Sequence, residues 1–291
     1  MHRITEKKVL AKGISRLVVE APLVVRGASA GQYVIVRTDE FAERIPLTIC
    51  NCDKSNGAIT LIVQEVGRST KDLCALNVGD EILDILGPLG TPSEIERYGT
   101  VAIIGGGVGV AQLYPVARAL KDKDNKVIAI LGARSKDLII LEDEMRRVAD
   151  EITITTDDGS YGMKGLVTDA LKRLIERGGP IDRIICCGPI LMMKAVTEVA
   201  RPKNITTIVS LNAILLDATG MCGTCRVTVS GKVHFSCVDG PDFDGFKVDF
   251  DELLLRNKRF LEEERRALEK VNGKRNNSTT KIEDARSEGK D

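Results

Sequence analysis

The stretch AIIGGGVGVAQLYPVARAL, residues 102–120, joins a run of apolar residues to an amphipathic stretch through a glycine-rich loop. Gly105, Gly106, Gly107 and Gly109 lack side chains, so backbone amides at the start of a helix can approach a pyrophosphate closely. The spacing differs from the G-x-G-x-x-G dinucleotide fingerprint, and such loops also occur as tight strand-to-helix turns. We interpret this stretch as a strand, a turn and a helix of a nucleotide-binding domain.

Similar apolar runs recur on both sides of this loop. Helical stretches such as AQLYPVARALKD, residues 111–122, and LVTDALKRLIERG, residues 166–178, separate them, which is typical of a parallel doubly wound sheet. The sequence therefore predicts an α/β domain over residues 99–212. Its expected strands are TVAIIG (100–105), KVIAILG (126–132), EITITT (151–156), RIICCG (183–188) and TTIVSL (206–211).

The first 98 residues have a different pattern. Short β-branched runs recur at roughly ten-residue intervals between Gly, Asp and Asn turns, as in RLVVE (16–20), YVIVR (33–37) and ITLIV (59–63). This spacing predicts a small antiparallel β-barrel that precedes the α/β domain.

Two short motifs in the barrel have the composition of phosphate- and ring-binding segments. RIPLT supplies Arg44, Pro46, Leu47 and Thr48, and VGRST supplies Gly67, Ser69 and Thr70. A cation, hydroxyls and small residues can hold a pyrophosphate, although each segment could equally be a surface turn. In the α/β domain, Arg134 follows the second expected strand and could contact a ribose or a 2'-phosphate, so the choice between NADH and NADPH stays open.

Three cysteines and an aspartate follow the last expected strand. Asp217-x4-Cys222-x2-Cys225-x11-Cys237 differs from a plant-type iron-sulfur spacing only in its first ligand, where a carboxylate replaces a thiolate. Cys222, Cys225, His234 and Cys237 also form a set suited to structural zinc, and unligated cysteines are a third interpretation. Gly220 and Gly223 favour a loop that wraps an inorganic cluster. We expect a metal module over residues 213–245.

The remaining C-terminal segment predicts a helix and a tail. VDFDELLLRNKRFLEEERRALEKV, residues 248–271, places apolar residues at helical spacing opposite a charged face, and the polar stretch beyond Val271 predicts disorder. We expect residues 246–291 to form this helix and tail. The helix could dock on a partner or cover the chain's own surface.

Composition limits the classes of partner. The 42 Lys and Arg residues equal the 42 Asp and Glu residues, so no overall field favours nucleic acid or a membrane surface. The start MHRITEKKVL lacks the apolar core of a signal peptide, and we expect a cytoplasmic protein. Eight cysteines in such a chain favour a metal or redox centre over disulfides, and two histidines leave little material for imidazole catalysis.

The motifs together resemble those of the ferredoxin-NADP reductase superfamily over residues 1 to about 212. The matching elements are R-x-P-L-T at 44–48, G-x-S-T at 67–70, G-P-L-G at 87–90, the glycine loop at 105–109 and C-G-P at 187–189. The resemblance implies a flavin (FAD) held by Arg44 and a nicotinamide cofactor, NAD(H). It places Thr48 near flavin N5 and Cys187 against the nicotinamide, as the candidate catalytic residues. Gly188, Pro189 and the loop TTDDGSYG with Asp157 complete the implied cofactor site.

The C-terminal third resembles one family more closely. VSLNAILLDATGMCGTCRVTV (209–229) and FSCVDGPDFDG (235–245) look like the small subunit of NADH-dependent reduced ferredoxin:NADP oxidoreductases. This resemblance implies a 2Fe-2S cluster with Asp217, Cys222, Cys225 and Cys237 as ligands. The related electron-transfer subunit of dihydroorotate dehydrogenase is similar throughout, with cysteine at the Asp217 position.

The resemblance also implies a function and a partner. Electrons would pass between NADH, FAD and the cluster to a larger flavin- and 4Fe-4S-containing subunit in a bifurcating heterodimer, with ferredoxin engaged indirectly. Two alternatives remain, which are the dihydroorotate dehydrogenase electron-transfer subunit and a zinc-stabilised, non-enzymatic interaction module.

Overall fold

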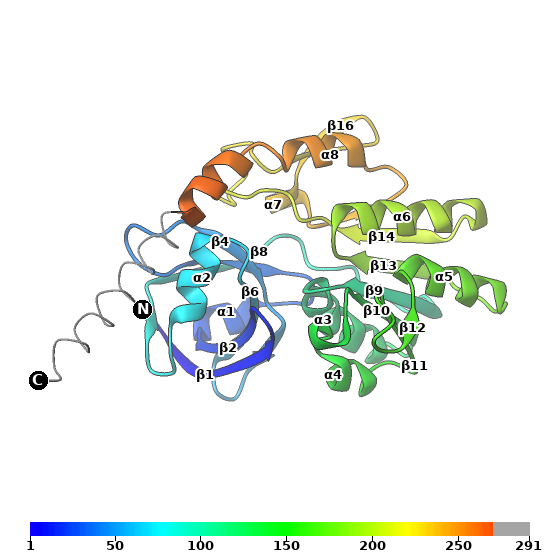
Figure 1. Cartoon of the computed structure of the whole chain (residues 1–291), viewed down its shortest axis with the longest axis horizontal. Helices are drawn as coiled ribbons and strands as arrows, with labels where there is room; N and C mark the ends of the chain where they lie inside the picture. Colours follow the sequence, from blue (N-terminus) through cyan, green and yellow to red (C-terminus); the bar gives the residue numbers. More distant parts are fainter. Residues whose placement is uncertain (270–291) are drawn as a thin grey trace, which may run out of the picture.

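The N-terminal part of the chain forms the expected antiparallel barrel in a computed structural model that describes residues 1–269 (Figure 1). Its strands pair in the orders β5-β6-β2-β1-β7 and β4-β3-β8, all antiparallel. Apolar residues from both sheets share one core, including Leu17 and Leu61 of the first sheet and Val34 of the second, so the sheets close on each other. The elements are β1 (His2–Ala11), β2 (Ile14–Glu20), α1 (Pro22–Gly27), β3 (Tyr33–Arg37), β4 (Ile45–Thr48), β5 (Asn51–Asp53), β6 (Ala58–Gln64), α2 (Arg68–Ala75), β7 (Glu81–Ile82) and β8 (Asp84–Leu89).

The α/β domain follows from Thr100. Its central strands are apolar and buried on both faces, as the sequence predicts for a parallel sheet covered by helices. The elements are β9 (Thr100–Gly106), α3 (Gly109–Lys121), β10 (Lys126–Ala133), η1 (Lys136–Leu138), α4 (Glu142–Arg146), β11 (Glu151–Thr156), β12 (Met163–Lys164), α5 (Val167–Glu176), β13 (Arg183–Cys187), α6 (Ile190–Ala200), η2 (Arg201–Lys203) and β14 (Thr206–Ser210).

The sheet has seven strands rather than the five expected, in the order β12-β11-β10-β9-β13-β14-β17. The two additions are β12, with two residues, and β17 (Asp242–Asp244), which pairs antiparallel with β14. The five expected strands pair parallel, and the antiparallel strand at this edge comes from the C-terminal module beyond residue 212. Short polar strands carry little apolar pattern, so the sequence did not reveal them.

Helices cover both faces of the sheet. Residues of α3 and α4 pack on one face, while residues of α5 and α6 pack on the other. The strand order reverses between β9 and β13, which makes the carboxyl ends of these two strands the switch point where such sheets bind ligands.

The C-terminal module starts with a long loop and a hairpin. It contains β15 (Arg226–Val229), β16 (Lys232–Phe235), α7 (Ser236–Asp239), β17 and α8 (Phe250–Arg256). The expected long helix is divided, because turn residues 257–260 separate α8 from a second helical segment at 261–269. Residues 270 and 271 of that helix and the predicted disordered tail lie outside the described residues.

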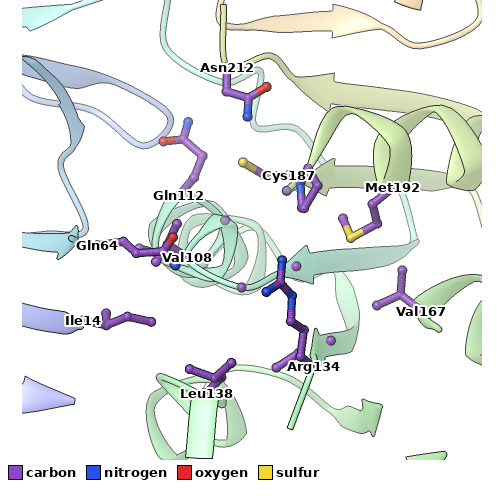
Figure 2. A pocket seen from close by; sticks show the side chains of 18 of the residues that line it. Ile14, Gln64, Val108, Gln112, Arg134, Leu138, Val167, Cys187, Met192 and Asn212 are labelled. Carbon is purple, nitrogen blue, oxygen red and sulfur yellow. The ribbon is translucent and has the colours of Figure 1, made fainter. Parts of the chain in front are cut away.

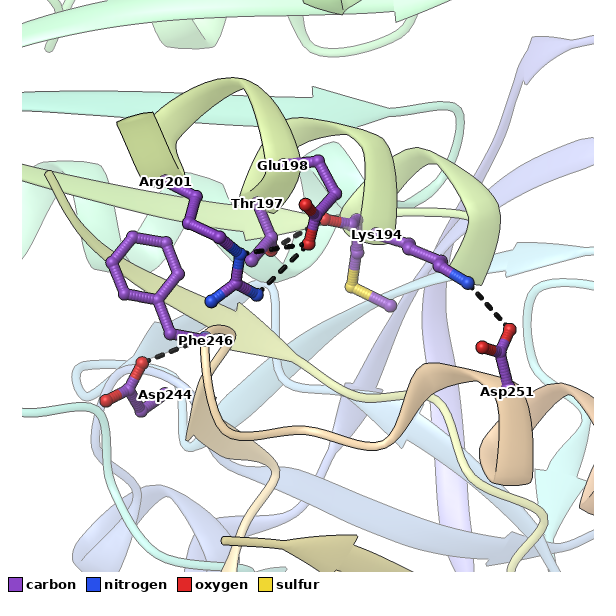
Figure 3. A network of polar contacts seen from close by, with 8 residues as sticks. Lys194, Thr197, Glu198, Arg201, Asp244, Phe246 and Asp251 are labelled. Carbon is purple, nitrogen blue, oxygen red and sulfur yellow. Dashed lines mark hydrogen bonds and ion pairs between the residues drawn. The ribbon is translucent and has the colours of Figure 1, made fainter. Parts of the chain in front are cut away.

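Polar contacts attach this module to α6 (Figure 3). Lys194 Nζ lies 2.6 Å from an oxygen of Asp251, and the Arg201 guanidinium lies 4.8 Å from the centre of the Phe246 ring. Phe250 and Leu253 of α8 are buried in the same core as α6. The inner face of α8 therefore covers this chain's own surface.

Over residues 1–269, no helix combines the length and the apolar composition that a membrane crossing requires.

Candidate functional site

A cavity of about 910 Å³ lies between the barrel and the switch point of the sheet (Figure 2). Ligand sites in proteins commonly have volumes of about 300 to 1,000 Å³. The barrel contributes residues of β2, β4 and β6, and the α/β domain contributes the loops that follow β9, β10, β11 and β13. The cavity is thus formed jointly by both domains.

Most of the residues expected to bind a cofactor line this cavity. They are Pro46, Leu47, Thr48, Thr70, Gly106, Gly107, Gly109, Arg134, Asp157, Cys187, Gly188 and Pro189. Arg44, Gly67 and Ser69 do not belong to the lining. Arg44 is exposed just before β4, and the Ser69 hydroxyl donates to Glu43 at 2.9 Å.

The glycine loop brings backbone close to the cavity. A side chain on Gly109 would overlap the Cys187 carbonyl, and one on Gly106 would overlap Met192. Gly107 has a φ of 55° and faces open space. Among the described residues, no side chain caps the N-terminus of α3, so its first amides and the positive end of its dipole face the cavity. This arrangement fits an anionic group such as a pyrophosphate.

Cys187 ends β13 and its sulfur is directed into the cavity (Figure 2). Burial, together with the Asp242 carboxylate, raises the pKa of the Cys187 thiol to about 12. The thiol is therefore neutral near pH 7 and suits contact with an uncharged ring rather than nucleophilic attack.

Arg134 follows β10 and lies away from Asn212 across the cavity (Figure 2). The ion pairs among residues 1–269 do not include Arg134, so its guanidinium is available to a ligand. Asp157 also lines the cavity, and its amide donates to the Ala133 carbonyl at 3.1 Å. This end can bind a polar group by charge and hydrogen bonds.

Gln112 was not expected at the site. It lies on α3, is 5% exposed, and accepts a hydrogen bond from the Thr48 hydroxyl at 2.7 Å. Its amide group donates to the Gly31 carbonyl at 2.8 Å and to the Ser210 hydroxyl at 3.2 Å. The only sequence signal for Gln112 was its polar side chain on an apolar helix, three residues beyond the glycine loop.

The cysteine loop begins at the same cavity. Asn212, just beyond β14, lines the cavity and lies five positions before Asp217. Asp217 accepts hydrogen bonds from the amides of Thr219 and Cys222, both at 3.0 Å. A single short segment therefore connects the cavity to the candidate ligands.

The four candidate ligands lie as two neighbouring pairs. The Asp217 carboxylate is hydrogen-bonded by Cys222, and the thiols of Cys225 and Cys237 lie within hydrogen-bonding reach of each other. Cys222 is exposed while Cys225 and Cys237 are buried. Burial and the neighbouring Cys225 thiol raise the pKa of Cys237 to about 12.

Arginines gather beside these pairs. Arg256 and Arg259 both donate to the Thr224 carbonyl in the loop, at 3.3 Å and 2.8 Å respectively. Burial, followed by repulsion from Arg259 and Arg226, lowers the pKa of Arg256. Its buried Nε has no hydrogen-bond partner among the described residues. The excess positive charge and this unpaired donor fit an anionic group bound by the loop.

His234 is not gathered with the cysteines. Its ring packs edge-on against Phe243 at 5.9 Å, and its Nδ1 lies 3.8 Å from Asp239. Within residues 1–269, no three or more His, Cys, Asp or Glu side chains converge as ligands of one metal ion. Neither the zinc set nor the four candidate iron-sulfur ligands are therefore gathered around a single point among these residues.

Two family models match the parts of the chain that form these sites. The oxidoreductase NAD-binding domain matches residues 103–198, which include the glycine loop and Cys187. The iron-sulfur cluster binding domain of dihydroorotate dehydrogenase B matches residues 212–249, which include all four candidate ligands.

Relatives are similar over nearly the whole chain. The dihydroorotate dehydrogenase B (NAD(+)) electron transfer subunit homolog of Thermotoga maritima is 46% identical, covering 93% of this chain and 95% of its own. The corresponding electron transfer subunit of Clostridium perfringens is 31% identical, with coverages of 85% and 97%.

One solved structure is also similar over nearly the whole chain. A chain from the NADH-dependent reduced ferredoxin-NADP oxidoreductase, a structure described for flavin-based electron bifurcation, superimposes with a TM-score of 0.89 and 45% identity. It covers 93% of this chain and 98% of its own. The protein therefore belongs to the family of electron transfer subunits that includes those of dihydroorotate dehydrogenase B, and it is an oxidoreductase subunit with NAD-binding and iron-sulfur binding domains.

Proposed function

We propose that this chain passes electrons between NADH, FAD and a 2Fe-2S cluster to a larger subunit of a bifurcating NADH-dependent ferredoxin:NADP oxidoreductase. The observation that carries this proposal is the continuity of two sites. The cavity between the barrel and the sheet leads through Asn212 directly into the Asp-Cys-Cys-Cys loop.

The proposed division of labour follows the fold. Residues 1–98 would bind FAD, residues 99–212 would bind NAD(H), residues 213–245 would hold the cluster, and residues 246–291 would support it. A bound flavin supplies the exchange between two-electron and one-electron carriers. The chain's own residues bind, orient and shield the cofactors.

Individual residues have distinct parts in this proposal. The Gly109 amide at the start of α3 would hold a phosphate in the open space beside Gly107, whose own amide donates to the Gly132 carbonyl at 2.9 Å. Arg134 and Asp157 would contact the remote half of NAD(H). Pro46, Leu47 and Thr48 would position the flavin ring, while Thr70 would face its phosphate end. Arg44, Gly67 and Ser69 lie outside the cavity lining and would bind the part of the phosphate that extends beyond it. Cys187, Gly188 and Pro189 would form a neutral surface for the nicotinamide.

The cluster assignment rests on the pairing of its candidate ligands. In a two-iron cluster each iron takes two protein ligands, so the pairs Asp217 with Cys222 and Cys225 with Cys237 suit two adjacent irons. Four anionic ligands also match the surplus of arginine charge beside the loop. A single zinc ion would require all four groups to converge on one point.

The partner assignment is supported by the solved relative. That structure is a ferredoxin-NADP oxidoreductase described for electron bifurcation, and its matched chain is 45% identical. We infer a heterodimer in which the larger subunit carries its own flavin and 4Fe-4S clusters, with ferredoxin contacting that subunit.

The electron transfer subunit of dihydroorotate dehydrogenase is the second candidate. The matched iron-sulfur model and the C. perfringens relative both favour it. Asp217 is the feature that would separate the candidates, since the resemblance implies cysteine at that position in the dihydroorotate dehydrogenase subunits.

The two candidates differ in the reaction of the complex. The chain would be copurified with its larger subunit and assayed under anaerobic conditions for two products. NADP reduction that requires both NADH and reduced ferredoxin is the expected result. Formation of orotate from dihydroorotate, without coupled NADP reduction, would replace the proposal with the second candidate.

A further inference from the structure

Gln112 connects three parts of the molecule at the cavity. Its side chain extends from α3 beside the cavity (Figure 2). It bonds to Thr48 in the barrel, to Gly31 in the loop before β3, and to Ser210 at the end of β14.

The Gly31 carbonyl determines the orientation of the Gln112 amide. A carbonyl oxygen can only accept a hydrogen bond, so the group 2.8 Å from it must be the NH2 of Gln112. The amide oxygen is then the atom 2.7 Å from the Thr48 hydroxyl. Because that oxygen cannot donate, Thr48 must donate its only hydroxyl proton to Gln112.

Ser210 supports the same direction of bonding. It lies 3.2 Å from the Gln112 NH2 and also contacts Asp242, its partner in the pairing of β14 with β17. Asp242 accepts a second hydroxyl bond from Ser93 at 2.5 Å. Ser210 can therefore accept from Gln112 while donating to Asp242, and no donor in this series is left without an acceptor.

Thr48 is consequently restricted in what it offers to the cavity. With its proton committed to Gln112, the hydroxyl oxygen has only lone pairs for a ligand and acts as an acceptor there. Oxidised flavin has an unprotonated N5, which can only accept, whereas reduced flavin carries a proton on N5 and donates. An acceptor at this position favours the reduced form.

We propose that Gln112 is a positioning residue that holds the Thr48 hydroxyl as an acceptor toward flavin N5 and thereby raises the flavin reduction potential. This inference rests on the proposed function, because it assumes that the cavity binds flavin beside Thr48. Gln112 itself acts through Thr48 and does not touch the reacting atoms.

The test compares flavin midpoint potentials by anaerobic spectroscopic titration of the purified chain. Gln112→Met keeps the length of the side chain but removes the amide, which frees the Thr48 proton to face oxidised N5. One hydrogen bond is worth about a tenfold change in equilibrium, so we expect the potential to fall by about 30 mV for a two-electron couple. If Gln112→Met does not fold, Gln112→Leu is titrated in its place.

Matched variants test whether the change in flavin potential passes through the Thr48 hydroxyl. Thr48→Val should lower the potential and Thr48→Ser should retain it. Gln112→Met added to Thr48→Val should cause no further change, because the effect passes through the hydroxyl. Gln32→Met is the control, since Gln32 is equally buried and makes two similar backbone hydrogen bonds outside the cavity lining.

The outcomes separate this inference from the proposed function. Flavin bound at the wild-type potential in Gln112→Met, or an additive effect in the double variant, would overturn the inference alone. Wild-type protein that binds no flavin would overturn both the proposed function and the inference.

Discussion

At the scale of single residues, Asp217 has two separable properties. It organises the loop by accepting the amides of Thr219 and Cys222, and it supplies a charged oxygen next to Cys222. The hydrogen bond from the Thr219 amide, with those from Cys222, lowers the pKa of Asp217. The carboxylate is therefore ionised at neutral pH and available as an anionic ligand.

Substitution of Asp217 is expected to weaken cluster binding. Asp217→Asn keeps an acceptor for the loop amides but loses the anionic oxygen, so we expect iron and sulfide to be lost at least tenfold faster under air. Asp217→Cys should retain a cluster with a shifted potential. Iron and sulfide content, followed over time, checks both results.

Asp251→Ala is the matched control for this series. Asp251 is exposed on α8, and among residues 1–269 it forms an ion pair with Lys194 alone, so its loss should leave the iron content unchanged. Normal cluster occupancy and stability in Asp217→Asn would show that the aspartate is not a ligand.

A buried thiol gives a prediction about alkaline pH. Burial, with the Glu144 carboxylate, raises the pKa of Cys50 to about 12, from a value near 9 in the unfolded chain. Above pH 9 the unfolded state loses this proton while the folded state keeps it. The free energy of unfolding should therefore fall as pH rises, by about 1.4 kcal/mol per pH unit for this group up to pH 12.

Cys50→Ala removes this titration. Urea unfolding at pH 8 and pH 10 should show a smaller loss of stability in the variant than in the wild type. The same loss in both proteins would contradict the assignment of Cys50 as a contributor.

At the scale of elements, apolar pattern decided what the sequence could predict. β3 and β11 have the expected bounds because their apolar residues are buried in sheets on which helices or strands pack. β17 was missed because its three residues, with two aspartates, become a strand only by pairing with β14. Such pairing depends on tertiary contact that local pattern does not contain.

The same distinction applies to the candidate site. The glycine loop was predicted from its place between a strand and a helix at one edge of a parallel sheet, whereas Cys187 was implied by the resemblance of its C-G-P motif. Gln112 was not predicted, since its partners Gly31 and Ser210 lie 81 and 98 positions away. Only the folded arrangement of barrel and sheet brings these groups together.

Helix α8 carries a charge that should tune the cluster. Arg256→Gln retains hydrogen-bond donors near Thr224 but removes a cation close to Cys225. Adding an electron to the cluster then becomes less favourable, and we expect its potential to fall by on the order of tens of millivolts. Redox titration followed by electron paramagnetic resonance measures this change.

Arg256→Lys is the control for this effect. It keeps the positive charge and should hold the potential near the wild-type value. Equal shifts in the Lys and Gln variants would indicate a change in loop geometry instead of an electrostatic effect.

At the scale of the whole molecule, the C-terminal segment has two faces. The inner face of α8 buries Phe250 and Leu253 against this chain, so this part of the helix covers the chain's own surface. Leu255 and Leu261 are 68% and 55% exposed. The outer face thus remains open to a partner.

A charge introduced on this outer face should weaken assembly with the larger subunit without changing the isolated chain. We expect Leu255→Glu with Leu261→Glu to reduce copurification of the larger subunit at least tenfold, because burying a charge in an apolar interface is costly. The visible spectrum of the isolated chain should be unchanged. Undiminished copurification would remove this face from the interface.

The central claim is that one chain holds a flavin and an iron-sulfur cluster in electronic contact. It is tested most directly by visible spectra of anaerobically purified protein before and after NADH, with iron, sulfide and zinc analysis of the same sample. We predict flavin bands over broad iron-sulfur absorbance, both bleached by NADH, with about two irons and two sulfides per chain. A colourless protein that contains zinc, or a flavin that NADH bleaches without any change in the iron-sulfur absorbance, would contradict it.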